Sequence, residues 1–298
     1  MVEQQNTVLL QISISYLRLK LQQMNKNVIT NFDKLKLSLF FIPFCLLVMI
    51  SIFLYVNHSF NVSNYVKIQK DVFYDMNNFL GQYPNFEYNL TQIGDASIFL
   101  SFIIFLILYT PKIWESLLTA LLSSLIFSFS LKRIFSVPRP AQVFDNNTFI
   151  ITGKAIVGNS SLPSGHALTM VTILTILMYG FMPKGKTNRI FYKIMFLLIA
   201  LLLISTRVGV GAHYPLDVLI GGIIGYICGL IGIFVSRKYK IWAWINNKIY
   251  YPLFIVVIIS CCITLIIKII NQNFIIFHLA LITLILSLYK FIYVYIKK

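Results

Sequence analysis

LSLFFIPFCLLVMISIFLYV, residues 37–56, is a run of twenty residues without a charged side chain. As an α-helix, which bonds its backbone polar groups internally, such a run is long enough to cross the roughly 30 Å hydrocarbon core of a bilayer. A polar, Gln- and Asn-rich segment of 36 residues precedes it, which does not fit a cleavable signal peptide. We therefore expect a true membrane span here.

The rest of the chain has the same character. Of its 298 residues, 58% are hydrophobic and 11% are charged, against roughly 25% charged in a soluble domain. A soluble globular protein is therefore excluded. The expected spans are 37–56, 96–109, 116–131, 166–182, 190–206, 218–236, 249–267 and 274–289. They predict an all-α fold, a polytopic membrane helical bundle.

Basic residues indicate how the bundle is oriented, because loops rich in Lys and Arg stay in the cytoplasm. Assigning the expected spans in turn puts most cations on one side, together with both termini. These cations are Arg18, Lys20, Lys26, Lys34, Lys36, Lys112, Lys184, Lys186, Arg189, Lys193, Arg237, Lys238, Lys240, Lys248, Lys290, Lys297 and Lys298. Loops 57–95 and 132–165 then face outward. The net charge of +16 comes mainly from basic residues in the cytoplasmic loops, which the orientation in the membrane explains. We therefore expect no nucleic-acid partner.

Three other sequence features have mainly structural interpretations. Segment 65–80 mixes aromatic and charged residues, which fits a helix lying on the membrane interface or one packed over the bundle. Gly221, Gly225 and Gly229 have the spacing that lets membrane helices pack closely. All four cysteines lie in apolar runs without metal-ligand spacing, so we expect neither a disulfide nor a metal site from them.

Polar clusters occur at the outward ends of four spans, where the positive-inside bias does not explain them. They are KRIFSVPRP (132–140), PSGH (163–166) and TRVGVGAHYPLD (206–217). Each cluster alone has an ordinary explanation, such as a snorkelling cation, a helix cap or a structural ion pair. Together they place Lys132, Arg139 and Arg207, two histidines and a carboxylate on one face. This combination predicts an anion-binding site.

The residue types in these clusters suit phosphoryl transfer, which needs pre-placed donors for the phosphate oxygens. Lys132, Arg139 and Arg207 supply charge, and the Ser164 hydroxyl and Gly165 amide complete the binding site. No carboxylate cluster that could hold magnesium is predicted on this face, so we expect neither a metal nor a cofactor.

Two histidines can then share the chemistry. Asp217, four residues after His213, is placed to accept from one ring nitrogen and leave the other free to attack phosphorus. His166 is the candidate that protonates the leaving group and later activates water. We expect His213, His166 and Asp217 to be the catalytic residues.

These motifs, at these spacings, resemble the type 2 phosphatidic acid phosphatase superfamily. All three signature motifs of the family occur in order between Lys132 and Asp217. The resemblance implies a six-span phosphatase core at 37–236. The segment at 1–36, which its basic residues assign to the cytoplasm, precedes this core, and two additional spans at 237–298 follow it. The resemblance also implies the same division of roles between the two histidines.

The expected function is that of a metal-independent membrane lipid phosphatase acting at the extracytoplasmic face through a phosphohistidine. Candidate substrates are polyprenyl diphosphate, phosphatidylglycerol phosphate, phosphatidic acid and the phosphates of lipid A. A lipid phosphotransferase with the same residues is an alternative, and so is a non-catalytic anion or lipid transporter. The pairing of His213 with Asp217 argues against the transporter. We expect a bacterial inner-membrane location, with the site facing the periplasm and membrane lipids as partners.

Overall fold

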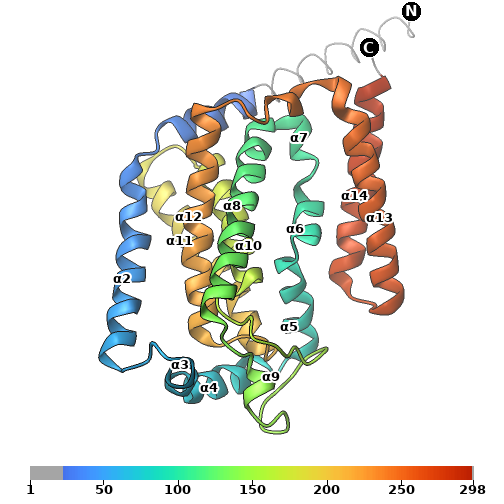
Figure 1. Ribbon diagram of the computed structural model, residues 1–298. Coiled ribbons are helices and arrows are strands. Elements are labelled where there is room, and N and C mark those ends of the chain that lie inside the picture. The colour runs from blue at the N-terminus through green and yellow to red at the C-terminus, as the bar shows by residue number, and fades with distance from the viewer. Residues whose placement is uncertain (1–22, 297–298) are drawn as a thin grey trace, which may run out of the picture.

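The computed structural model describes residues 23–296, a bundle of helices that run between an upper and a lower end in Figure 1. This part of the chain contains helices and no strand. The helices along the bundle are α2 (Phe41–Val56), α6 (Ala96–Ile103), α7 (Leu106–Tyr109), α8 (Pro111–Phe135), α10 (Gly165–Gly180), α11 (Lys186–Gly209), α12 (Pro215–Lys238), α13 (Tyr251–Asn271) and α14 (Ile275–Ile296). The predicted all-α bundle is confirmed.

Several shorter elements lie at the ends of these helices or link them. They are α3 (Val62–Ile68), α4 (Lys70–Leu80), α5 (Pro84–Thr91), α9 (Pro140–Val143) and the 3-10 helices η1 (Leu37–Phe40), η2 (Gln92–Gly94), η3 (Ala243–Asn246) and η4 (Lys248–Tyr250). Figure 1 shows α3, α4 and α9 at the lower end, while the described chain ends lie at the upper end. Residues 1–22 of the expected N-terminal segment, with Arg18 and Lys20, and the terminal Lys297 and Lys298 lie outside the described residues.

Six of the expected spans are helices long and apolar enough to cross a membrane, within the part of the chain described. They correspond to Leu37–Val56, Pro111–Val143, Lys186–Gly209, Pro215–Lys238, Lys248–Asn271 and Ile275–Ile296. The span expected at 166–182 is α10, an apolar helix of 16 residues.

Segment 96–109 departs from the single span expected there, because it forms the two short helices α6 and α7. The Ile103 carbonyl accepts a hydrogen bond from the Trp114 indole at 3.2 Å, and the Ile107 amide donates to Ile104 instead. A side chain from α8 therefore takes the acceptor that a continuous helix would use.

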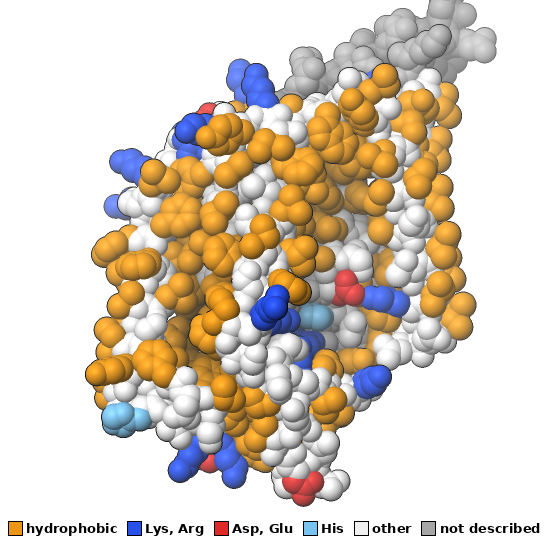
Figure 2. All heavy atoms as spheres, in the orientation of Figure 1, with side chains coloured by type: hydrophobic (Ala, Val, Ile, Leu, Met, Phe, Trp, Pro, Cys, Tyr) orange, Lys and Arg blue, Asp and Glu red, His pale blue; other side chains and the backbone are white. Residues whose placement is uncertain are grey.

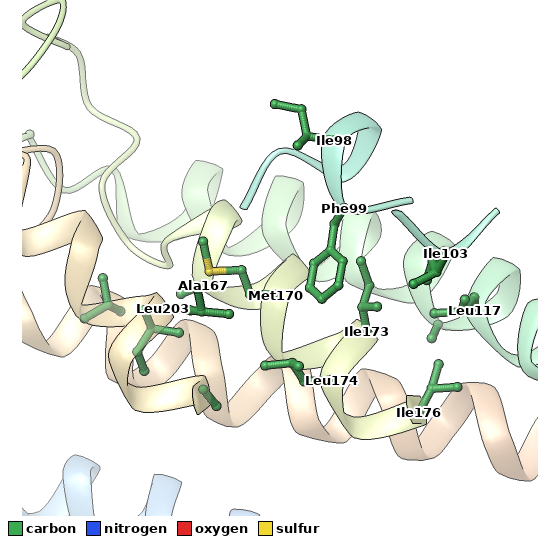
Figure 3. Packing of buried hydrophobic residues seen from close by; sticks show 14 of the residues in the cluster. Ile98, Phe99, Ile103, Leu117, Ala167, Met170, Ile173, Leu174, Ile176 and Leu203 are labelled. Atoms are coloured by element: carbon green, nitrogen blue, oxygen red, sulfur yellow. The ribbon is translucent and has the colours of Figure 1, made fainter. Parts of the chain in front are cut away.

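Helix α10 is the centre of the apolar core. Its residues Met170, Ile173 and Ile176 are fully buried. Figure 3 shows them packed together with Phe99 of α6 and Leu117 of α8. Contacts on several sides hold α10 in one position, which also fixes the residues at its lower end.

The glycines of α12 explain how closely it approaches α10. A Cβ atom built on Gly221 would lie 2.7 Å from the Ser164 carbonyl oxygen, and one on Gly225 would lie 2.5 Å from the Leu168 carbonyl oxygen. Both separations are far shorter than a normal contact, so only glycine permits this approach. The predicted packing role of the glycines is confirmed, and it sets the distance between the PSGH segment and the start of α12.

Segment 65–80 forms α3 and α4, which lie across the lower end of the bundle (Figure 1). Tyr65 and Phe73 are buried, and the Asn77 side-chain amide donates to the Val208 and Gly209 carbonyls of α11 at 3.0 and 3.1 Å. Of the two interpretations left open by the sequence, packing over the bundle fits these contacts.

Helices α13 and α14 form a hairpin at one edge of the bundle, beside α6 and α7 (Figure 1). At its lower end the Phe274 ring contacts Tyr88 of α5, with ring centroids 4.8 Å apart. The hairpin thus packs against the segment that leads into α6.

Candidate active site

The eight residues predicted for the site lie at the lower ends of four helices, which meet below the apolar core (Figure 1). They are Lys132 in the last turn of α8, Arg139 in the link to α9, Ser164, Gly165 and His166 at the start of α10, Arg207 in the last turn of α11, His213 in the following turn, and Asp217 in the first turn of α12. The contacts described below join them into one cluster.

The turn between α11 and α12 fixes His213. Its backbone amide donates to the Arg207 carbonyl at 3.2 Å, and the residue is 1% exposed. The turn depends on Gly211, whose φ of +75° disfavours other residues and whose Cβ position lies 2.7 Å from the Ile150 carbonyl oxygen. The backbone itself therefore sets the position of the imidazole.

Asp217 and His213 are close but not directly hydrogen-bonded. His213 Nδ1 lies 3.6 Å from Asp217 Oδ2, and the Ser161 hydroxyl lies between them. Ser161 donates to Asp217 Oδ2 at 2.5 Å and is 3.4 Å from His213 Nδ1. Asp217 also accepts from Tyr65 at 2.8 Å and from the Tyr214 amide at 3.1 Å. The carboxylate is thus held firmly, and Ser161 connects it to the ring.

The start of α10 adjoins this group. The Ser164 amide donates to the Asp217 carbonyl at 3.0 Å, and the Ser164 hydroxyl caps the helix by accepting from the Ala167 amide at 3.4 Å. A Cβ atom built on Gly165 would lie 3.4 Å from Lys132 Nζ, so the lysine ammonium sits beside the Gly165 backbone. His166 is half-buried next to it.

Two buried guanidinium groups complete the cluster. Arg139 Nη1 donates to the Ala212 carbonyl at 3.0 Å and lies 3.1 Å from His213 Nε2. Arg207 Nη1 donates to Thr91 Oγ1 at 2.8 Å. The Nε atom of each arginine is buried without a hydrogen-bond partner among the described residues. A buried donor left unpaired costs about 1–3 kcal/mol, so an anion that accepts from both would be favoured here.

Burial is the main electrostatic influence on His213. It lowers the pKa of the imidazole well below its ordinary value, and the positive charges of Arg139, Arg207 and Lys132 lower this pKa further. His213 is therefore neutral near pH 7, the state in which a ring nitrogen has a lone pair.

Three residues that contact the predicted set were not identified from the sequence as site residues. Ser161 bonds Asp217, Thr91 bonds Arg207, and Tyr65 reaches Asp217 from α3. Ser161 lies three residues before Ser164, and Tyr65 begins the segment noted for its aromatic and charged residues. Thr91 has no such signal, because it lies in a polar segment far from every motif.

Figure 2 shows a hollow on one face where basic, acidic and histidine side chains gather within an otherwise apolar surface. Across residues 23–296, no group of three or more His, Cys, Asp or Glu side chains is placed to hold a metal ion. The donors that surround His213 are cations and hydroxyls, which bind anions.

Comparison with protein families agrees with these features. Residues 113–242, which contain all eight predicted residues, match the PAP2 superfamily. The crystal structure of Aquifex aeolicus LpxE is similar, at 27% sequence identity with a TM-score of 0.46, over 58% of this chain and 96% of that one. No curated protein matches the chain. Residues 113–242 of this integral membrane protein therefore match the PAP2 superfamily, whose members are metal-independent phosphatases.

Proposed function

We propose that the protein hydrolyses a phosphate from a membrane lipid, with His213 as the nucleophile. The observation that carries this proposal is the pair of orphaned Nε donors on Arg139 and Arg207, which belong to the same cluster as the neutral, buried His213. A phosphoryl group that accepts from both arginines and from Lys132 would be brought next to the imidazole. A membrane lipid phosphatase is the general function that the family match supports.

In the first step, His213 Nε2 bonds to phosphorus and the bond between phosphorus and the leaving oxygen breaks. Nε2 now accepts from Arg139 Nη1 at 3.1 Å, so that donor must turn to a phosphate oxygen before the lone pair is free. Nδ1 keeps its proton and donates toward the Ser161 hydroxyl, which itself donates to Asp217. The negative charge of Asp217 thus polarises the hydroxyl that faces the ring. The positive charge that develops on the imidazole is thereby stabilised.

His166 completes the cycle in this proposal. It protonates the departing oxygen, then removes a proton from the water that attacks the phosphohistidine, and the bond from nitrogen to phosphorus breaks. His213 returns to its neutral form and inorganic phosphate leaves.

An apolar cavity supports a lipid rather than a soluble substrate. It measures about 390 Å³ and is lined by residues of α2, α8 and α12. Tyr65, which bonds Asp217, and Pro163, which precedes Ser164, both border it. A hydrocarbon chain in this cavity would lie beside the site, which makes polyprenyl diphosphate, phosphatidylglycerol phosphate, phosphatidic acid and lipid A the classes to test.

The test is release of phosphate by the purified protein from each of these lipids, with and without EDTA. We expect turnover of at least one lipid, unchanged by EDTA, and no turnover or acid-labile phosphoenzyme in His213→Ala. His166→Ala should keep most of its activity on p-nitrophenyl phosphate, whose leaving group departs without a proton. Lipid turnover that persists in His213→Ala would refute the mechanism, and no phosphate release from any lipid would refute the function.

We further place the site on the extracytoplasmic side of a bacterial inner membrane, with both termini in the cytoplasm. The number of basic residues in the loops supports this orientation, since 184–193 and 237–248 lie at the end opposite the site.

A further inference from the structure

The C-terminal hairpin is tied to the core by an ion pair close to the site. Lys268 Nζ of α13 lies 2.7 Å from Asp95 Oδ2, at the start of α6. The other oxygen of Asp95 accepts from the Ser97 amide at 2.9 Å and so caps α6. Burial raises the pKa of Asp95, but the hydrogen bonds and charge from Lys268 and Ser97 outweigh it and hold the pKa below its ordinary value. Asp95 is therefore a charged group with a fixed position.

Asp95 follows the residue that packs against His166. A Cβ atom built on Gly94 would lie 2.7 Å from both Cβ and Cδ2 of His166 and 2.5 Å from the end of Met170. The backbone before Asp95 therefore packs directly against the imidazole, and a shift of Asp95 would move this backbone and the ring that it contacts.

The charges that act on His166 from the surrounding elements have opposite signs. Arg207 of α11, Lys132 of α8 and Arg139 of the α8–α9 link are positive, while Asp95 is negative. Burial disfavours a protonated imidazole most, the three cations disfavour it further, and the carboxylate favours it. An acid that must hold a proton until the leaving group departs needs such a counter-charge.

We propose that Asp95, held by Lys268 of the additional hairpin, is a positioning residue for His166. The backbone of the preceding Gly94 packs against the ring, and the Asp95 carboxylate favours the protonated imidazole amid three cations. The proposal rests on the proposed function. It gives α13 and α14, which lie beyond the family match, a part in the reaction.

The test compares two substrates that differ in their need for a proton. A lipid phosphate has a poor alkoxide leaving group, whereas p-nitrophenyl phosphate has a good one. Asp95→Asn keeps a residue that caps helices well but removes the charge. We expect kcat for the lipid to fall about tenfold, a part of the usual 10²–10⁴-fold effect of general acid catalysis, and kcat for p-nitrophenyl phosphate to change less than about twofold. Asp95→Glu should be closer to the wild type than Asp95→Asn on the lipid.

A charge exchange separates this role from simple docking. In the double variant Asp95→Lys with Lys268→Asp, the ion pair can form with reversed polarity, so thermal stability should recover relative to Asp95→Lys alone. Lipid turnover should stay low, because a cation now lies beside His166. Full recovery of lipid turnover would show that the pair only docks the hairpin, and would overturn the proposal.

Glu115→Gln is the matched control. Glu115 forms an ion pair of the same length with Lys112, at 2.7 Å, and accepts from Asn246 in the segment that leads to α13. We expect this variant to act on both substrates like the wild type. Equal losses on both substrates in Asp95→Asn, or no loss on either, would overturn the role of Asp95. Absence of lipid turnover in the wild type would instead overturn the proposed function.

Discussion

Ser161→Ala tests the part of the site that the sequence did not identify. The Ser161 side chain is fully buried and donates to the charged Asp217 at 2.5 Å. A hydrogen bond to a charged group contributes about 1.5–3 kcal/mol. If that contribution acts only when the imidazole becomes positive, its loss lowers kcat about ten- to a hundredfold, since 1.36 kcal/mol corresponds to a factor of ten. We expect the lower part of this range, because the carboxylate is 3.6 Å from Nδ1 and can move to bond it directly.

The assay is phosphate release under saturating lipid, together with the yield of acid-labile phosphoenzyme in a single turnover. Ser236→Ala is the control, because Ser236 is buried at the other end of α12 and its hydroxyl bonds the neutral Ser116 at 2.8 Å. It should be destabilised slightly and keep its kcat. A Ser161→Ala enzyme with a kcat within about twofold of the wild type would refute the connecting role of Ser161.

Three further predictions concern charge, packing and topology. Because the pKa of His213 is lowered, the neutral nucleophile should persist as the pH falls. The acid limb of the pH profile of kcat/KM for p-nitrophenyl phosphate should therefore lie below pH 6.5, and a limb at or above that value would contradict the assignment. Gly225→Ala should lower stability by about 1–3 kcal/mol in thermal unfolding, because its Cβ would overlap a backbone carbonyl of α10. Gly222→Ala is its control, since the nearest atom there is 3.4 Å away, and equal losses in both variants would exclude this packing account. In a cysteine-free background, a cysteine at Asn146 should be labelled from outside the cell and one at Lys186 should not, while the reverse pattern would place the site in the cytoplasm.

Hydropathy and motif spacing were sufficient for much of this protein. A helix that crosses a bilayer must be about 20 apolar residues long, so composition along the chain shows where most helices run. The cations and histidines at the outer ends of the spans are conspicuous in this apolar sequence. Charged groups at the membrane are costly to bury, so their presence indicates a function. Lys132, His166, Arg207 and His213 could therefore be assigned to one site before their contacts were known.

The remaining features depend on contacts between segments that are distant in the sequence. The Trp114 indole interrupts the segment predicted as a continuous helix by bonding the Ile103 carbonyl, eleven residues earlier. Ser161 and Thr91 join the site only because α12 and α11 bring Asp217 and Arg207 to them, over 56 and 116 residues. Hydropathy and periodicity show which side chains of a segment must be buried and which must find a polar partner, but they do not identify that partner. Which side chain bonds a buried carboxylate or guanidinium is decided when the helices pack, because a hydrogen bond forms only within about 3.5 Å and in the right direction.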